Sequence, residues 1–299
     1  MKNKAARSTW NQTPVAWGMM LPYLLIFFTF TLLPVLVSIV LSFTDFNLLQ
    51  MPGFVGINNY IRLFLKDDIF LIAMSNTLVF ALITGPVGYI LCFIFAWMLN
   101  ELGPRLRAFL TLLFYAPSMT GSMYIIWRFV LSDDSRGIVN SFLLNMNLIS
   151  EPIKWLKDTQ YMFITVIIVV LWQSIGTSFL VFIAGLQNVD RSYYEAGMMD
   201  GIQNRWQELW YVTLPLMRPQ LLFGAVMSIS GSFNIGAAIT ALVGFPSTDY
   251  AVHTIVHHLE DYGTIRFEMG YASAIATVLF LIMIGSNKLV QKILGGVGK

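Results

Sequence analysis

Residues 194–219 read YEAGMMDGIQNRWQELWYVTLPLMRP and form a polar stretch between two long apolar segments. Gly201 suits a turn between two helices, because glycine takes up positive φ without strain. Asp200 before it fits a helix cap or a turn. Pro215 and Pro219 end the second helix before the next apolar segment begins. The stretch therefore predicts a compact helical hairpin between two membrane spans, a shape typical of a docking surface.

The composition places the chain among membrane proteins. Of its 299 residues, 57% are hydrophobic and 11% are charged, whereas soluble domains usually carry about a quarter of charged residues. The net charge of +2 gives no support for nucleic acid binding. The single cysteine, Cys92, excludes a disulfide or a cysteine-based metal site within the chain. Cys92 lies in an apolar run, which predicts a core position in a helix.

Six apolar stretches are long enough to cross a hydrocarbon core of about 30 Å, which takes about 20 residues of helix. The gaps between them are too short for a soluble domain. The sequence therefore predicts an all-α fold, a polytopic membrane helical bundle of about six transmembrane helices. The predicted spans are 17–43, 71–98, 108–131, 161–186, 220–244 and 269–291.

The basic residues predict which side of the membrane each loop faces. An even number of spans places both termini on one side, and Lys and Arg gather on the cytoplasmic side. We therefore expect cytoplasmic termini, a cytoplasmic tail over 1–16, a transmembrane domain over 17–299, and a cytoplasmic hairpin at 187–219, here called the outcrop. Eleven of the 18 basic residues support this orientation: Lys2, Lys4, Arg7, Arg105, Arg107, Arg191, Arg205, Arg218, Lys288, Lys292 and Lys299.

The middle of each predicted span is free of ionisable residues. Proton-coupled carriers usually need such groups at membrane depth, so a carrier of that kind is disfavoured. A sodium site made of backbone carbonyls at broken helices stays open. The only Gly-Lys pair is Gly298-Lys299, so the sequence has no phosphate-binding loop. We therefore expect no catalytic residues and no cofactor in this chain; if ATP drives it, another chain hydrolyses the ATP.

Neutral polar side chains are frequent in the predicted spans. Most small polar residues there serve helix packing. An amide is different, because in lipid it leaves several donors and acceptors unsatisfied. Amides, hydroxyls and aromatic faces are also what an uncharged polyhydroxyl solute would need. The candidates for a solute pathway are Tyr115, Trp172, Gln173, Ser232 and Asn234.

Two histidines follow the fifth predicted span. His253 and His257 lie four residues apart, a spacing compatible with one metal ion on a helix. A third ligand is not evident nearby, so we interpret them as surface histidines and predict no metal site.

The outcrop contains two short motifs, Glu195-Ala196-Gly197-x-x-x-Gly201 and Val212-x-Leu214-Pro215. Together they resemble the Glu-Ala-Ala loop of binding-protein-dependent ABC importer permeases. The chain departs from that pattern in three ways. Gly197 stands where alanine is usual, Val212 stands where isoleucine is usual, and one additional residue separates the motifs, which bears on the register of the second helix.

The resemblance extends over nearly the whole chain. It points to the carbohydrate branch of the family, similar to the maltose-importer type of permease. The further matching segments, in order, are Leu21-Pro22-Tyr23, Ser42-Phe43-Thr44-Asp45, Val55-Gly56-Ile57-Asn58-Asn59-Tyr60, Asn76-Thr77, Gly137-Ile138-Val139-Asn140 and Gly270-Tyr271-Ala272-Ser273-Ala274.

The resemblance implies a type I ABC importer permease fold in a bacterial inner membrane. It also implies four kinds of partner: a second, related permease subunit; two ATPase subunits that carry ATP and Mg; an extracellular solute-binding protein; and the sugar or oligosaccharide that the solute-binding protein delivers. In the family the Glu-Ala-Ala helix sits in a cleft of the ATPase, with its glutamate against the ATPase surface. The residues expected to couple ATP hydrolysis to transport are therefore Glu195, Ala196, Gly197, Asp200, Gly201, Leu214 and Pro215.

Three alternatives remain. An ion-coupled secondary carrier would show internal repeats and ionisable or broken-helix sites, and the two halves show no convincing repeat. An importer permease for a non-sugar solute such as glycerol 3-phosphate would look similar at this level. A membrane-embedded enzyme would need paired carboxylates or a ligand cluster at membrane depth, and the sequence offers neither.

Overall fold

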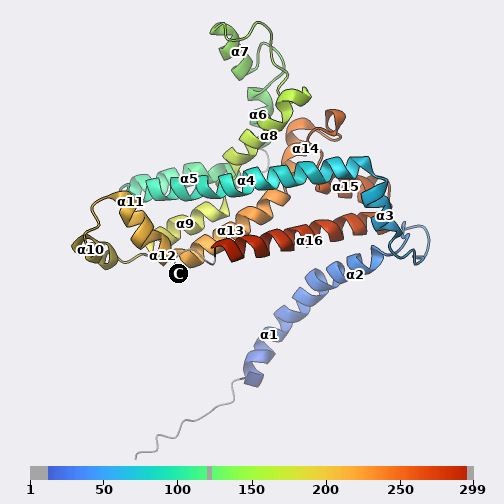
Figure 1. The fold of residues 1–299 in the computed structure, drawn as a ribbon, viewed down its shortest axis with the longest axis horizontal. Coiled ribbons are helices and arrows are strands. Elements are labelled where there is room, and N and C mark those ends of the chain that lie inside the picture. The colour runs from blue at the N-terminus through green and yellow to red at the C-terminus, as the bar shows by residue number, and fades with distance from the viewer. Residues whose placement is uncertain (1–12, 120–122, 295–299) are drawn as a thin grey trace, which may run out of the picture.

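The chain folds into a bundle of helices, which the computed structural model describes over residues 13–119 and 123–294 (Figure 1). Residues 1–12, 120–122 and 295–299 lie outside the description. Most of the predicted tail at 1–16 therefore has no structural account. Within the described ranges, β-pairing is limited to an isolated bridge between Thr44 and Phe54. The all-α prediction is confirmed. The basic residues that support the orientation but lie outside the description are Lys2, Lys4, Arg7 and Lys299.

The helices have the following bounds. Four short segments are not α-helical: π-helical turns at Phe28–Leu32, Leu209–Thr213 and Asp261–Ile265, and a 3-10 turn at Thr248–Tyr250. The α-helices are α1 (Thr13–Phe27), α2 (Leu33–Leu41), α3 (Asn58–Leu65), α4 (Asp68–Asn100), α5 (Pro104–Met119), α6 (Met123–Val130), α7 (Ile138–Asn145), α8 (Thr159–Gln173), α9 (Thr177–Gln187), α10 (Arg191–Met199), α11 (Arg205–Glu208), α12 (Leu214–Leu216), α13 (Arg218–Phe233), α14 (Gly236–Val243), α15 (Ile255–Glu260) and α16 (Met269–Leu294).

Among the described residues, 4 helices are long and apolar enough to cross a membrane, or up to 6 if each of two bent pairs counts as one crossing. The prediction of about six spans agrees with this range. The bent pairs are α5 with α6, at 88°, and the segment 205–216 with α13, at 82°. The four unbent candidates match the first, second, fourth and sixth predicted spans: Ala16–Leu41, Asp68–Asn100, Thr159–Gln187 and Met269–Ile293.

Besides the span formed by α5 and α6, two predicted spans contain a break inside the apolar run. The predicted span 161–186 comprises α8 and α9, and Gly176 between them has φ −125° and ψ −134°, far from helical values. The predicted span 220–244 comprises α13 and α14, and Asn234 ends α13 with φ −106° and ψ 36°. Glycine and asparagine both favour leaving a helix, glycine through backbone freedom and asparagine through local hydrogen bonding. The sequence predicts the extent of these two spans but not the breaks inside them.

The long helix α4 packs against both breaks. A Cβ atom added to Gly85 would lie 3.2 Å from the Ser232 Oγ, and one added to Gly88 would lie 2.9 Å from the Ser174 Oγ. Small residues of this kind let helix backbones approach closely within a membrane. Cys92, buried as predicted, donates its thiol to the Ser174 carbonyl at 3.3 Å. Helix α4 therefore supports the point where α8 ends.

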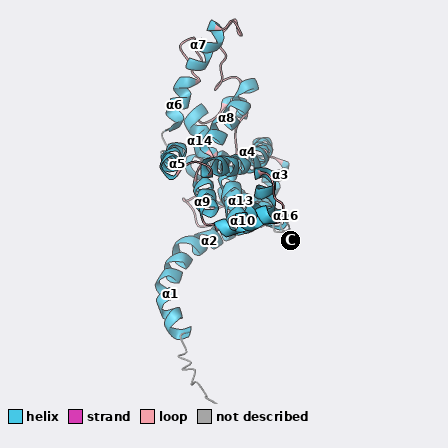
Figure 2. Cartoon of the chain, turned by 90° about the vertical axis from the view of Figure 1, so that its left-hand side faces the viewer, coloured by secondary structure: helices cyan, strands magenta, loops and turns pink. Residues whose placement is uncertain are grey.

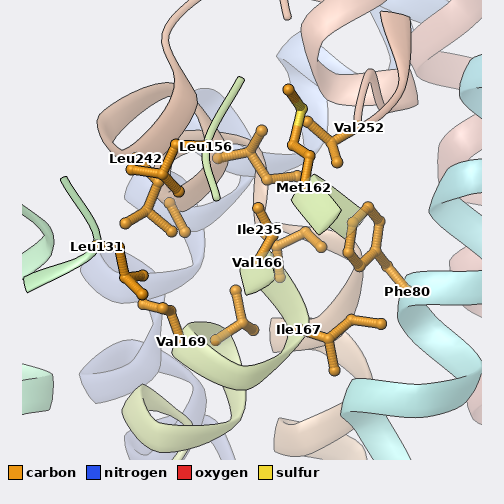
Figure 3. Close-up of a cluster of buried hydrophobic side chains, with 13 residues drawn as sticks. Phe80, Leu131, Leu156, Met162, Val166, Ile167, Val169, Ile235, Leu242 and Val252 are labelled. Atoms are coloured by element: carbon orange, nitrogen blue, oxygen red, sulfur yellow. The ribbon is translucent and has the colours of Figure 1, made fainter. Parts of the chain in front are cut away.

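Three clusters of buried apolar side chains hold the bundle together. Figure 3 shows the first, in which Phe80 projects from α4 among side chains of α8, α14 and the neighbouring loops. Phe80 also stacks on Phe163, with ring centroids 4.3 Å apart. The second cluster joins α4, α9 and Met217 around Phe182. The third joins α3, α4, α15 and α16 around Phe70.

The first half of the first span, α1, stands apart from the rest, whereas the second half, α2, packs against α16. A π-helical turn joins α1 to α2, so that residues 16–41 form one apolar rod. No part of its most apolar window is buried against other described residues. Figures 1 and 2 show α1 leading away from the bundle on the side opposite to α7.

Candidate functional site

The first helix of the outcrop, α10, begins and ends with specific backbone hydrogen bonds. The Asp190 carboxylate caps its start by accepting from the Ser192 N–H at 3.0 Å. At its end the Ile202 N–H donates to the Gly197 carbonyl at 3.0 Å, and Gly201 has φ +94°. This is the glycine-terminated helix end in which a positive φ closes the last turn. The turn predicted at Gly201 is confirmed.

Gly197, the departure from the family pattern, is buried between the two helices of the outcrop. A Cβ atom at this position would lie 2.9 Å from the Ile202 Cδ1 and 3.3 Å from the Val212 Cγ2. Ile202 follows the turn and folds back over α10, so its side chain occupies the volume of an alanine methyl group. Asp200 occupies the C-cap position of α10, in agreement with the predicted cap.

The second helix of the outcrop contains a π-helical turn at Leu209–Thr213. A π turn closes its hydrogen bonds from i to i+5, so it holds one more residue than an α turn. This accounts for the additional residue between the two motifs. Leu209 and Thr213 are buried, whereas Trp206 and Trp210 are exposed.

The residues predicted to couple ATP hydrolysis to transport lie on α10, in the turn after it and in α12. Exposed Glu195 lines a cavity of about 770 Å³ between the outcrop and the adjacent ends of α4, α5 and α9. Leu214 is half-buried and lies outside the set that lines either cavity. The other predicted residues line a second pocket of about 590 Å³: Ala196, Gly197, Asp200, Gly201 and Pro215.

A separate cavity of about 380 Å³ lies where both helix breaks meet α4. Its described lining carries no charged side chain. Three of the five predicted pathway residues line it, namely Gln173, Ser232 and Asn234. The structure therefore brings together the two amides that the sequence singled out.

The Gln173 side chain has one acceptor without a hydrogen-bond partner among the described residues. Its Nε2 donates to the Pro117 carbonyl at 3.4 Å, while its Oε1 is buried without a hydrogen-bond partner among the described residues. Leaving a buried acceptor unpaired costs about 1–3 kcal/mol. A bound hydroxyl donor would remove that cost. The Ser232 hydroxyl is already satisfied, because it donates to the Ile229 carbonyl at 2.7 Å.

The other two predicted pathway residues lie away from this cavity. Trp172 packs edge to face on Trp127, with ring centroids 5.4 Å apart. Tyr115 lies in α5, where its carbonyl accepts a hydrogen bond from the Ser118 hydroxyl. The prediction missed further polar lining residues, which lie within two turns of a helix break, on α4 or, for Tyr124, on α6. They are Thr84, Tyr124, Ser174, Thr177, Ser178 and Ser228.

The histidines after the fifth span are buried, and their interpretation as surface residues is wrong. His253, His257 and the adjacent His258 are 3%, 1% and 2% exposed. They belong to α15 and the residues before it, which fold back against α4 and α16. Burial lowers the pKa of His253 to about 3, which keeps its ring neutral. Among the described residues, no group of three or more His, Cys, Asp or Glu could hold a metal ion.

The same buried region joins the ends of three helices. The His258 Nε2 lies 3.0 Å from the Asp67 carboxylate, which also accepts from the Tyr271 hydroxyl at 2.7 Å. Burial alone would raise the pKa of Asp67, but the hydrogen bonds from His258, Tyr271 and the Phe70 N–H hold it well below its usual range. Asp67 therefore stays ionised and links α15, α16 and the start of α4.

Comparison with known proteins shows one family along nearly the whole chain. Residues 8–294 match the family described as binding-protein-dependent transport system inner membrane component. The chain is 30% identical over 286 residues to the probable ABC transporter permease protein YesP of Bacillus subtilis, covering 94% of this chain and 90% of that protein. It is 32% identical over 277 residues to the lactose transport system permease protein LacF of Rhizobium radiobacter, covering 90% and 89%.

The fold has close counterparts among solved structures. A chain in the crystal structure of a bacterial ABC transporter involved in the import of the acidic polysaccharide alginate superposes with a TM-score of 0.76. The two chains are 22% identical, and the match covers 95% of this chain and 97% of that chain. A second structure of the alginate transporter, in complex with an alginate pentasaccharide-bound periplasmic protein, also gives a TM-score of 0.76, at 21% identity and covering 95% and 96%.

Proposed function

The chain belongs to the family of binding-protein-dependent transport system inner membrane components, and we propose that it is the permease subunit of an ATP-driven importer for a neutral sugar or oligosaccharide. The relatives named as lactose and arabinooligosaccharide permeases support a carbohydrate substrate. An extracellular solute-binding protein delivers the sugar, and the membrane is the inner membrane of a bacterium. The transmembrane permease domain covers 17–299, after a cytoplasmic tail at 1–16.

The residues that line the cavity at the two helix breaks are the observation from which we infer the substrate class. The cavity volume of about 380 Å³ falls in the range of ligand pockets, about 300–1,000 Å³. The described lining offers amides and hydroxyls, with the free Gln173 Oε1 among them. Recognition of carboxylate or phosphate groups relies on Arg and Lys, and the described lining has neither. This composition favours a neutral polyol over an acidic polysaccharide or glycerol 3-phosphate.

The outcrop is the proposed contact with the ATPase subunits. Glu195 and Ala196 are exposed on α10, so they are free to meet another chain. The sequence has no phosphate-binding loop, so two partner ATPases bind ATP and Mg and supply the hydrolysis. Their closure moves α10 and shifts the bundle between inward- and outward-facing states. The exposed apolar rod at 16–41 is the proposed contact with the second permease subunit.

A self-contained secondary carrier is the second candidate, because one specific feature favours it. Broken helices at membrane depth form the ion and substrate sites of such carriers, and this bundle has two of them. Family membership and the absence of ionisable residues in the middle of the spans favour the importer. The two functions differ in the energy source, which uptake experiments measure directly.

The test is uptake by proteoliposomes that contain the chain, its permease partner and its ATPases, with the binding protein added outside. We expect uptake of a labelled neutral disaccharide that requires ATP inside the liposomes and persists without an ion gradient. Uptake driven by a sodium or proton gradient without ATP would refute the importer. Preferred uptake of glycerol 3-phosphate or an acidic oligosaccharide would refute the substrate class.

A matched pair of variants tests the cavity. Gln173→Ala removes the free acceptor, and we expect the transport rate at limiting sugar to fall about tenfold, as for one lost hydrogen bond to a buried partner. Gln160→Ala, at the exposed start of the same helix, should leave the rate unchanged. Equal rates in both variants would remove Gln173 from the pathway.

A further inference from the structure

The second helix of the outcrop is tied to the end of α4 by one arginine. The Arg205 Nη2 lies 2.9 Å from the Glu101 Oε2, just beyond the last turn of α4. The other terminal nitrogen of Arg205 donates to both carboxylate oxygens of Glu208 at 2.8 Å. Glu208 belongs to the same helix as Arg205, so this second contact stays within the outcrop. Arg205 thus bridges the outcrop and α4.

An aromatic contact reinforces this bridge. The Trp206 ring, next to Arg205, lies against the Trp97 ring, with centroids 5.2 Å apart and planes tilted by 52°. Trp97 and Glu101 are four residues apart, so they lie on one face of the chain at the end of α4. The ionic and aromatic contacts therefore join the same two segments side by side.

These contacts link the outcrop to both walls of the central cavity. Through the chain, the outcrop continues into α13 across an 82° bend, and Ser228 and Ser232 of α13 line the cavity. Through Arg205 and Trp206, the outcrop contacts α4, and Thr84 and Gly88 of α4 also line the cavity. A displacement of the outcrop can therefore reach two pathway helices by two separate routes.

We propose that Arg205 is a positioning residue that makes α4 move together with α13 when the outcrop is displaced. The proposal rests on the proposed function, in which ATPase closure displaces the outcrop. The Arg205 and Glu101 side chains are 62% and 43% exposed, and ion pairs at such exposure contribute little to folding stability. The role of the pair is therefore geometric, and its loss should leave the fold intact while α4 lags behind the outcrop.

The test measures the sugar imported per ATP hydrolysed by the complete importer in proteoliposomes. Arg205→Gln and Glu101→Gln should each lower this ratio about two- to thirtyfold, the range of single-residue effects on coupling between sites. The double variant should be no worse than either single variant, because both remove the same contact. Arg205→Lys keeps the charge and should restore most of the ratio.

Two control variants separate this contact from general effects of charge. Glu208→Gln removes the pair within the outcrop helix and leaves Glu101 opposite Arg205. Lys157→Gln breaks an ion pair with Asp133, 2.9 Å long, that joins the segments before and after α7, and the Lys157 side chain is 74% exposed. Both variants should import at the wild-type ratio. Wild-type ratios in Arg205→Gln and Glu101→Gln, or effects that multiply in the double variant, would overturn the proposal.

A second readout does not depend on transport. Spin labels are attached to Met98→Cys at the end of α4 and to Tyr193→Cys on α10, in a Cys92→Ser background. Both positions are exposed, and electron paramagnetic resonance measures the distance between the two labels. We expect one narrow distance distribution that broadens with Arg205→Gln and stays narrow with Glu208→Gln. An unchanged distribution in Arg205→Gln would overturn the proposal even if ATP-driven import is confirmed. Failure of the wild-type complex to import would instead refute the proposed function, while these distances still decide whether Arg205 holds α4.

Discussion

Replacing Gly197 by alanine sets two opposing effects against each other in the outcrop. Gly197 lies inside α10, where alanine is favoured over glycine by about 0.5–1 kcal/mol because it restricts the unfolded backbone. The new Cβ atom, however, would lie 2.9 Å from the Ile202 Cδ1. Overpacking of this kind costs about 1–3 kcal/mol. The lower end applies here, because Cδ1 is the mobile end of a half-buried side chain.

The net effect of Gly197→Ala is therefore close to zero, about 0–1 kcal/mol destabilising. Removing the clashing atom by Ile202→Val reverses the balance. Ile202→Val alone costs about 0.5–1.5 kcal/mol, but in the double variant the alanine methyl group fills the vacated space. We therefore expect a favourable interaction energy of about 1–2 kcal/mol between the two substitutions. The sign of this interaction energy tests the reasoning more directly than its size does.

Hydrogen–deuterium exchange of the α10 amides in the purified complex measures this energy, since local opening sets the exchange rate. An interaction of 1.4 kcal/mol slows exchange tenfold relative to the sum of the single variants. Ala196→Gly, at an exposed position of the same helix, isolates the helix-propensity effect and should speed exchange about two- to fivefold. Strictly additive effects of Gly197→Ala and Ile202→Val would show that Ile202 does not exclude alanine from this position.

Three further predictions concern the bundle and its outer segments. Gly224→Ala should lower the thermal midpoint, because the added Cβ would clash with the Phe182 ring at a cost of about 1–3 kcal/mol; Gly231→Ala, on the same helix with nothing within 4 Å, should not. Asn140→Ala should expose residues 132–155 to protease, because the Asn140 amide makes five hydrogen bonds to that segment; a wild-type digestion pattern would contradict this. Acidification should destabilise the protein, because burial lowers the pKa of His253 from 6.5 to about 3. The unfolded chain then binds the extra proton first, so stability is full above pH 6.5 and falls toward pH 3; the midpoint of His253→Gln should depend less steeply on pH over this range.

The sequence predicts the spans well where apolar residues alone determine the structure. The bounds of α4 and α16 follow from the lengths of their apolar runs. The breaks at Gly176 and Asn234 are hidden, because both lie inside stretches that are apolar enough on average to span a membrane, and hydropathy does not record the direction of a helix. The structure forms them where α4 presents Gly85 and Gly88, a tertiary contact that a window of neighbouring residues does not contain.

In the candidate site, too, some features could be predicted from the sequence and others could not. Gly201 could be predicted, because a helix end of this kind needs positive φ, and Gln173 could be predicted, because a buried amide needs a partner. The π turn at 209–213 shows in the sequence only as one surplus residue between two motifs. Their position between the fifth and sixth predicted spans makes His253 and His257 look exposed, but α15 folds back onto α4 and α16 and buries them. The burial comes from packing between segments distant in sequence, which residue spacing does not record.

The two helix breaks also determine the electric field inside the cavity. Each break places the C-terminal end of one helix beside the N-terminal end of the next, α8 beside α9 and α13 beside α14. A helix carries roughly half a negative charge at its C-terminal end and roughly half a positive charge at its N-terminal end. At each break these two partial charges lie close together and largely cancel. The backbone therefore gives the cavity no preferred sign of charge. A basic residue introduced at Ser228 would find no acidic partner in the described lining, so its charge would be free to attract an acidic solute.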